Sequence, residues 1–349
     1  AFDPEVHVDD RTMFEQIIEL AEFADQIGLD SIWIAEHHLT PYGGSVPSVP
    51  VLLAAIAQRT KKLKLATRGV ALPLHRPLEV AEQLSMVDNL SGGRLRIGFV
   101  RAFLAHEFEA YNVDMNESRD RFNEAVEIIL GVWANDGYTY KGRFSSVENV
   151  TMTPKPIQRP RPPVTIGSIM TRESFEYAGT HGFDCMLVPY VIGNDNLKRV
   201  IQWYTDALKA AGHRREDRNI MAQYFFCCDE DEKVAYETGR KAMLKYLGYV
   251  RDAVQADRWS KDYPGYDGLA KKVEELIGDF DLLYKDRLVV GTPERCVQRL
   301  RDIHALGIDE VTLMPNIPAM PRSMVKSSME LLRDRIMPAL ASSGLRKTA

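Results

Sequence analysis

The chain has 349 residues, of which 45% are hydrophobic, and a formal net charge of −5. Its lysines and arginines are scattered, so the sequence offers no basic surface for DNA, RNA or an anionic membrane. It contains no run of about 18 apolar residues, and residues 1–10 are acidic without an apolar core, which excludes a spanning helix and a secretory signal from this sequence. We therefore expect a cytoplasmic protein.

Short apolar or β-branched runs alternate with longer amphipathic runs, as in βα units around a parallel sheet. Seven strands are predicted, at Ser31–Ala35, Leu63–Ala71, Leu95–Val100, Val164–Gly167, Cys185–Pro189, Ile220–Cys228 and Glu310–Met314. Helices are predicted at Thr12–Ile27, Pro50–Arg59, Pro77–Leu90, Ser118–Trp133, Thr171–His181, Asn194–Ala211, Glu230–Val250, Pro293–Leu306 and Ser323–Leu340. This order favours an α/β fold of the (β/α)8 TIM barrel class, with residues 1–349 as a single barrel domain.

A closed barrel of this class needs an eighth strand. The run at residues 2–8 is a poor central strand because it contains Pro4 and acidic residues, so we expect a first strand to precede Ala1. Two segments interrupt the alternation. Residues 135–163 predict a hairpin and a proline-rich connector, and residues 252–290 predict a mobile lid, because they are too long for an ordinary loop.

In a barrel of this class the chemistry lies where strands end and βα loops begin. Arg101 directly follows one strand, where a guanidinium can bind a phosphate in a bidentate fork; its alternative role is a salt bridge with Glu107 or Glu109. Gly167 ends another strand and permits close approach. Ser168 and Thr171 follow it at the start of a helix, where they can bind the same phosphate or simply cap the helix.

The sequence "AEHHL" places Glu36, His37 and His38 at the end of the first predicted strand. A metal ion needs three or four convergent ligands, and neighbouring strand-end residues are expected to diverge, so no metal site is predicted. One imidazole held by a carboxylate such as Glu107 can act as a general base near neutral pH. A packed, hydrogen-bonded histidine without catalytic function is the equally weighted alternative.

Several stretches are similar to the bacterial luciferase-like flavin-dependent monooxygenases. They are "GLDSIWIAEHHLTPYG", "ATRGVALPLHRPLEVAEQLSMVDNLSGGRLRIGFVRAFLAHEFEAYNVDMNESRDRF" and "VVGTPERC", in matching order along most of the chain. The resemblance implies an FMNH2- and O2-dependent monooxygenase that oxygenates an organic substrate through a flavin C4a-(hydro)peroxide, by Baeyer–Villiger, aldehyde or hydroxylation chemistry. It also implies FMN as cofactor, a separate flavin reductase that supplies FMNH2, and a homodimer formed through the helices near residues 50–60 and 77–90.

The resemblance also implies roles for particular residues. His37 matches the catalytic histidine of the EHH motif, and Glu107 the carboxylate that orients it. Arg101 matches the phosphate-binding arginine, and Ser168 with Thr171 a serine–threonine pair at the same phosphate. Gly69 falls, with Arg68, where the family often has a non-prolyl cis peptide beneath the flavin.

One departure is Val100, which stands where luciferases carry a reactive cysteine beside the flavin, so light emission from an aldehyde is not expected. Two alternatives to oxygenation remain. The same barrel can bind a deazaflavin such as F420 and transfer a hydride without oxygen, and some chains of this type are non-catalytic flavin-binding partner subunits.

Overall fold

The computed structural model describes residues 9–40, 42, 46–169, 171–254 and 269–344. The weak strand candidate at residues 2–8 and the central part of the predicted lid lie outside these residues. The described chain divides into two compact units, which we call the N-terminal unit (10–167) and the C-terminal unit (168–254 and 269–344). The expectation of a single barrel domain stays a prediction.

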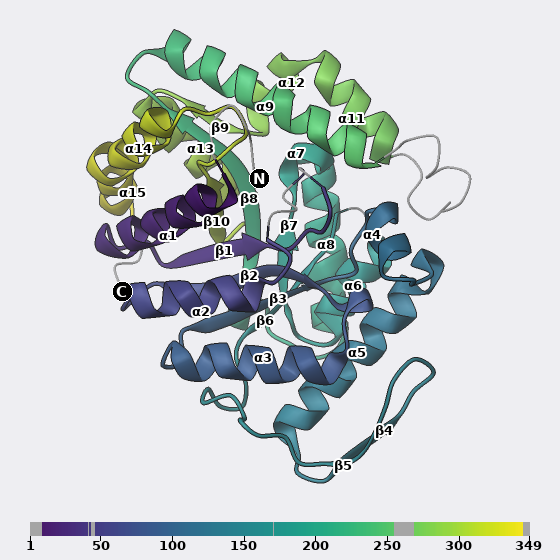
Figure 1. The fold of residues 1–349 in the computed structure, drawn as a ribbon. Coiled ribbons are helices and arrows are strands. Elements are labelled where there is room, and N and C mark those ends of the chain that lie inside the picture. The colour runs from purple at the N-terminus through teal and green to yellow at the C-terminus, as the bar shows by residue number, and fades with distance from the viewer. Residues whose placement is uncertain (1–8, 41, 43–45, 170, 255–268, 345–349) are drawn as a thin grey trace. The chain divides into compact units, whose positions relative to one another are not determined.

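The N-terminal unit contains four strands that pair in parallel in the order β1-β2-β3-β6 (Figure 1). Their bounds are β1 Ser31–Ala35, β2 Lys64–Ala71, β3 Leu95–Val100 and β6 Val164–Gly167. All four were predicted to within one residue. Their carboxyl ends lead into the loops that carry Glu36, His37 and Arg101, because parallel strands all end at the same edge.

The helices of this unit are α1 Asp10–Gln26, α2 Val49–Arg59, α3 Pro77–Leu90, α4 Ala105–Ala110 and α5 Ser118–Ala134, with short 3-10 turns η1 Leu72–Leu74 and η2 Met115–Glu117. Prolines occupy the first turn of α2 and α3, where the missing N–H has no partner to lose. Helix α4 was not predicted, because its six residues are too few for a helical repeat to appear. It nevertheless carries Glu107.

Strands β2 and β3 approach each other closely at two glycines. The Thr67 hydroxyl donates to the carbonyl of Gly98 (2.9 Å) and accepts from the N–H of Gly98 (2.8 Å), at the point where the β2–β3 register shifts. A Cβ at position 98 would lie 2.4 Å from the Thr67 carbonyl oxygen, and one at Gly69 would lie 2.6 Å from Val100 Cγ1. Only glycine fits at either position without movement of the neighbouring chain.

The predicted hairpin is confirmed as an antiparallel pair, β4 Tyr138–Lys141 and β5 Ser146–Val150. Its turn is attached to α5 by Glu124, whose carboxylate accepts the N–H groups of Arg143 (2.9 Å), Phe144 (3.1 Å) and Ser145. Figure 1 shows the hairpin extending away from the strands of its unit.

The connector after the hairpin is held by Asp88 on α3. This carboxylate is fully buried and accepts from the N–H groups of Ile157 (2.8 Å) and Gln158 (3.0 Å) and from Nε2 of Gln158 (2.7 Å). We expect Asp88→Ala to lower the free energy of unfolding by about 2–3 kcal/mol, because these donors lose their acceptor in a buried site. Chemical denaturation measures the change. Glu82→Ala, at an exposed position of the same helix, should change it by less than about 0.5 kcal/mol, and equal effects of the two would contradict this account.

The C-terminal unit contains the strands β7 Asp184–Leu187, β8 Ile220–Cys228, β9 Val289–Gly291 and β10 Glu310–Met314. Strand β8 pairs in parallel with the other three. All nine of its residues are buried, as expected for a parallel strand covered on both faces. β9 was not predicted, because three residues are too short to distinguish from a loop.

The helices of this unit are α6 Arg172–Thr180, α7 Pro189–Ile192, α8 Asn194–Ala210, α9 Glu232–Val254, α11 Leu269–Gly278, α12 Phe280–Asp286, α13 Pro293–Ala305, α14 Arg322–Leu331 and α15 Met337–Ser342, with a 3-10 turn η3 Arg215–Asp217 and a π-helical turn η5 Leu332–Ile336. The described end of the predicted lid therefore folds into α11, α12 and the start of β9. Its movement and its lid function stay predictions.

Candidate active site

His37 and Glu107, predicted to act together, lie next to each other in the N-terminal unit. His37 Nδ1 is 3.4 Å from Glu107 Oε1, and the side chains are 15% and 2% exposed. The separation is longer than a well-formed hydrogen bond, and Nδ1 makes none with the described residues. Catalytic contacts of this length are common in ligand-free enzymes and tighten when a ligand binds.

The loops after β1 and β3 meet around the His37 ring. Tyr42 and Phe103 flank it, with ring centroids 4.7 Å and 5.8 Å away. Each loop also contains a non-glycine residue with left-handed backbone, Leu39 (φ 58°) and Ala102 (φ 60°). Such residues cost about 1–3 kcal/mol each, and they persist where surrounding contacts fix the chain. The backbone around His37 is thus held in a strained conformation.

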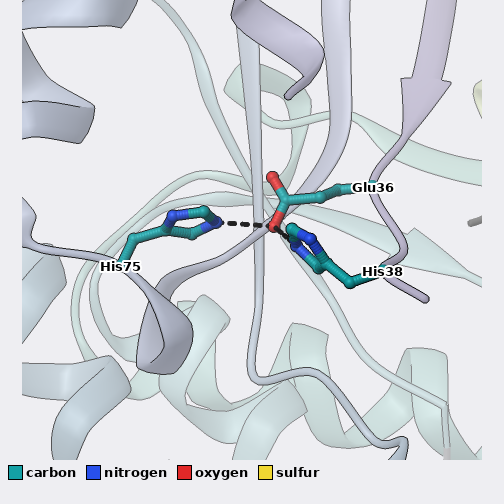
Figure 2. Close-up of side chains that lie close together, drawn as sticks. All are labelled: Glu36, His38 and His75. Carbon is teal, nitrogen blue, oxygen red and sulfur yellow. Dashed lines mark hydrogen bonds and ion pairs between the residues drawn. The ribbon is translucent and has the colours of Figure 1, made fainter. Parts of the chain in front are cut away.

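Glu36, which precedes His37 in the chain, contacts a second group of side chains. Its Oε1 is 2.7 Å from His75 Nε2, 3.2 Å from His38 Nε2 and 3.1 Å from the Ala71 N–H that donates to it. Figure 2 shows the two imidazoles reaching the same carboxylate oxygen from different sides. We call Glu36, His38 and His75 the Glu36 cluster.

The charge of the Glu36 cluster follows from these contacts. Burial disfavours the ionised form of Glu36, but the hydrogen bonds and charges of His38 and His75 outweigh it and lower the pKa of Glu36 from 4.5 to about 2. Burial likewise opposes a charge on His75, yet the hydrogen bond and charge of Glu36, helped by Glu79, raise the pKa of His75 above 6.5. These contacts therefore favour an ionised Glu36 and a protonated His75.

The stability of the protein should depend on pH through this cluster. Because the folded-state pKa of Glu36 is depressed, its contribution is fully present above pH 4.5 and is lost as the pH falls towards about 2. Because the pKa of His75 is raised, its contribution is fully present below pH 6.5 and is lost as the pH rises through the folded-state value. Between pH 4.5 and 6.5 we expect the free energy of unfolding of wild type to exceed that of Glu36→Gln by on the order of 3 kcal/mol. Denaturation of both proteins from pH 3 to 9 measures the difference, and a difference independent of pH would contradict the assigned charges.

Neighbouring residues at the end of β1 face different partners, because His37 faces Glu107 whereas Glu36 faces His75. Residues two apart converge, and this was not predicted. The His38 ring turns back onto Glu36, and His75 joins them from the end of η1, so that one ligand atom of each residue lies within 4.8 Å of the others. The 2.7 Å between His75 Nε2 and Glu36 Oε1 is nevertheless shorter than the spacing of about 3.3 Å between two ligands of a tetrahedral zinc ion. It is the spacing of a hydrogen bond, and the absence of a metal stays a prediction.

Arg101 and Gly69 also belong to the N-terminal unit, at the ends of β3 and β2. Arg101 is half-buried and lies two residues before Phe103, which touches the His37 ring. The non-prolyl cis peptide expected at Arg68–Gly69 is wrong: the cis bonds of the described chain are Thr153–Pro154 and Arg159–Pro160. Strand β2 instead accommodates Gly69 through register shifts against β1 and β3.

Ser168 and Thr171 lie in the C-terminal unit, directly after Gly167, which ends β6. Thr171 is the N-cap residue of α6, but its side chain accepts no helix N–H and instead lies 3.1 Å from Ser174 Oγ. Ser168 is buried, and its Oγ has no hydrogen-bond partner among the described residues. Simple helix capping is therefore not what these hydroxyls do, and a phosphate is a fitting acceptor for the unpartnered hydroxyl of Ser168.

The sequence reasoning missed the Glu36 cluster and Tyr111, whose hydroxyl lies 2.9 Å from His38 Nδ1. His75 follows β2 by only four residues, so it too stands at the carboxyl end of a strand. The signal that could have identified His75 is its position one short turn beyond the end of β2.

Residues 2–310 match the luciferase-like monooxygenase family, and this chain belongs to that family. It is 24% identical to the oxygenase component of the flavin-dependent trigonelline monooxygenase of Acinetobacter baylyi, over 95% of this chain and 91% of that one. It is 26% identical to the alkanal monooxygenase alpha chain of Photobacterium leiognathi, over 94% of both chains.

Solved structures agree in fold. Monooxygenase RslO1 of Streptomyces bottropensis matches with a TM-score of 0.85 and 32% identity, over 95% of this chain and 94% of that one. The FMN complex of the oxygenating constituent of 3,6-diketocamphane monooxygenase from Pseudomonas putida matches with a TM-score of 0.73 and 20% identity, over 94% of this chain and 93% of that one. The coenzyme F420-dependent tetrahydromethanopterin reductase of Methanopyrus kandleri matches with a TM-score of 0.71 and 18% identity, over 93% of this chain and 95% of that one.

These findings confirm the predicted α/β barrel fold class and the predicted family. They support flavin-dependent monooxygenation as the general reaction. No helix in the described part of the chain has the length and apolar character needed to cross a membrane.

Proposed function

We propose that this chain uses reduced FMN and O2 to oxygenate an organic substrate, with FMNH2 delivered by a separate flavin reductase. The observation that carries the proposal is His37 with Nδ1 facing the buried carboxylate of Glu107, within a family of flavin-dependent monooxygenases. When bound, reduced FMN would supply the two electrons needed to activate O2, so that one oxygen atom enters the substrate and the other leaves as water.

The residues of this chain that we assign to the flavin are Arg101, Ser168, Thr171, Gly69 and Gly167. Arg101 offers a forked cation to the phosphate, and the buried Ser168 hydroxyl offers a donor that has no acceptor among the described residues. We assign Gly167 to the close approach of the phosphate and Gly69 to the strand beneath the ring, where Val100 fills the space that a Cβ at position 69 would need.

We assign to His37 the movement of a proton at its Nε2 atom. The Glu107 carboxylate faces Nδ1 and so favours the imidazole tautomer that carries its proton on Nδ1. In this tautomer Nε2 is the atom that can exchange a proton with a reacting group. Glu107 orients the ring, and Tyr42 and Phe103 keep water from it. When neutral, the His37 ring can accept a proton at Nε2, which favours Baeyer–Villiger or aldehyde chemistry at a substrate carbonyl. When protonated, it can donate that proton, which favours hydroxylation of an electron-rich ring.

The two alternatives make different predictions about cofactor and oxygen. A hydride-transfer enzyme would bind a deazaflavin in preference to FMN and would work without air; the similarity to the coenzyme F420-dependent enzyme extends to the fold alone. A non-catalytic partner subunit would bind FMN and turn over nothing, but the paired His37 and Glu107 favour a catalyst.

The function is tested by titrating the protein with FMN and with a deazaflavin, then supplying a flavin reductase, NADH and three probe substrates. An alkanal, trigonelline and a camphane diketone are suitable, because relatives are named for them. We expect FMN to bind preferentially and oxygenated product to form only in air. Preferential deazaflavin binding with turnover under argon would establish the hydride-transfer alternative.

We also propose that the chain forms a homodimer through α2 and α3, which pack side by side. Val51, Met86 and Leu90 on these helices are 71%, 52% and 50% exposed, and a partner subunit on these helices would bury them. Met86→Glu with Val51→Glu should convert a dimer into a monomer in sedimentation velocity measurements. Val234→Glu, on α9, should not, and a wild-type monomer would contradict the proposal.

A further inference from the structure

His38 is held on every polar group that it possesses. Its Nε2 contacts Glu36 (3.2 Å) and its Nδ1 contacts the Tyr111 hydroxyl (2.9 Å). Its main-chain N–H donates to Glu107 Oε1 (2.7 Å), and its carbonyl oxygen lies 3.1 Å from His106 Nε2. The residue is only 2% exposed. A side chain fixed at both ring nitrogens fixes its own main chain as well, because few rotamers satisfy both contacts.

The oxygen that accepts the His38 N–H is the same Oε1 of Glu107 that faces His37 Nδ1. The orientation of Glu107 towards His37 therefore depends on where the main chain at His38 lies. That position depends in turn on the His38 ring and on its buried partner, Glu36. A continuous set of contacts runs from Glu36 through His38 and Glu107 to His37.

Glu36 is the buried carboxylate at the end of this set that lies furthest from His37 along the contacts. It is 5% exposed, it accepts from two imidazoles and from the Ala71 N–H, and in the described structure its carboxylate makes no hydrogen bond or ion pair with the His37 ring. A buried charge of this kind is maintained only while its partners stay in place, so it enforces one arrangement of the groups around it.

We propose that Glu36 is a positioning residue for the His37–Glu107 pair: its carboxylate fixes the His38 ring, and the His38 main-chain N–H then fixes the Glu107 oxygen that faces His37. The relevance to catalysis rests on the proposed function, whereas the positioning itself does not. The competing role for the same three side chains is a divalent cation site, which the 2.7 Å spacing of Glu36 and His75 disfavours.

The test compares Glu36→Gln with wild type in two measurements. The first is exchange of the His38 amide proton with solvent, followed by NMR without cofactor or substrate. We expect exchange to accelerate by about tenfold or more, the equivalent of one weakened hydrogen bond to a charged acceptor. The second is oxygenated product per FMNH2 consumed, which should fall while the FMN dissociation constant stays within about twofold of wild type.

Two further variants keep the test decisive. Glu82→Gln removes an exposed carboxylate of α3 that has no contact with the Glu36 cluster in the described structure, and it should leave both measurements at their wild-type values. Tyr111→Phe removes the other contact of the His38 ring from a half-exposed position that the fold tolerates, and it should accelerate amide exchange in the same direction as Glu36→Gln.

Unchanged exchange of the His38 amide in Glu36→Gln would overturn the positioning role, whatever the activity. So would stoichiometric binding of Zn2+ to the metal-free wild type that His75→Gln abolishes, because the cluster would then be a metal site. Faster exchange in a protein that shows no oxygenation with any substrate would leave the positioning intact and count against the proposed function alone.

Discussion

His37→Ala should lower oxygenated product per FMNH2 consumed by about 10²- to 10⁴-fold, the range that general acid–base catalysis contributes. FMN affinity should stay close to wild type, because the imidazole is assigned to the proton and not to the phosphate. The lost product should appear as hydrogen peroxide, since flavin oxidation continues without transfer of oxygen to the substrate. Both products are measured in one reaction with the reductase present.

His106→Ala is the matched control for this prediction. His106 is a neighbouring histidine whose Nε2 lies 3.1 Å from the His38 carbonyl oxygen and to which we assign no proton transfer, so its loss should have a much smaller effect. If the two variants lose product equally, or if His37→Ala keeps its wild-type yield, His37 does not carry the proton chemistry.

Arg101→Ala should raise the FMN dissociation constant by about 10²- to 10³-fold, because two charge-assisted hydrogen bonds to the phosphate are lost. Riboflavin, which lacks the phosphate, should bind wild type and Arg101→Ala with similar affinity. Fluorescence titration of both flavins against both proteins separates a phosphate contact from general damage to the site.

Arg76→Ala removes an exposed arginine that pairs with Glu79, and it should bind FMN like wild type. A comparable loss of affinity for FMN and riboflavin in Arg101→Ala would show that Arg101 supports the fold or the ring and does not bind the phosphate.

The regular parts of the fold were predictable because their signals are local. The fully buried β8 is apolar except for Gln223, and α3 begins at Pro77 and ends at Leu90 as its pattern indicates. The short elements α4, α7 and β9 were missed, because three to six residues hold less than two full periods of a helix or strand. Their conformations depend on tertiary contacts such as that of Glu107 with the His38 N–H.

The candidate site was predictable where residues follow strands and not where the chain folds back. His37 and Glu107 lie next to each other as expected, since His37 follows β1 and Glu107 lies on α4, shortly after β3. The convergence of Glu36 with His38 and His75 was not predicted: residues two apart lie on one side of an extended chain, but β1 ends at Ala35 and His75 comes from beyond β2. Leu39, with its left-handed backbone, belongs to the same departure from extended chain.

The central claim is that a flavin with its phosphate on Arg101 presents its ring to His37, and a crystal structure of the FMN complex tests it most directly. The account predicts the phosphate within hydrogen-bond distance of the Arg101 guanidinium and the isoalloxazine beside the imidazole of His37, with Nδ1 of that ring still facing Glu107. A flavin bound away from Arg101 and His37, or a metal ion ligated by the imidazoles of this site, would contradict it.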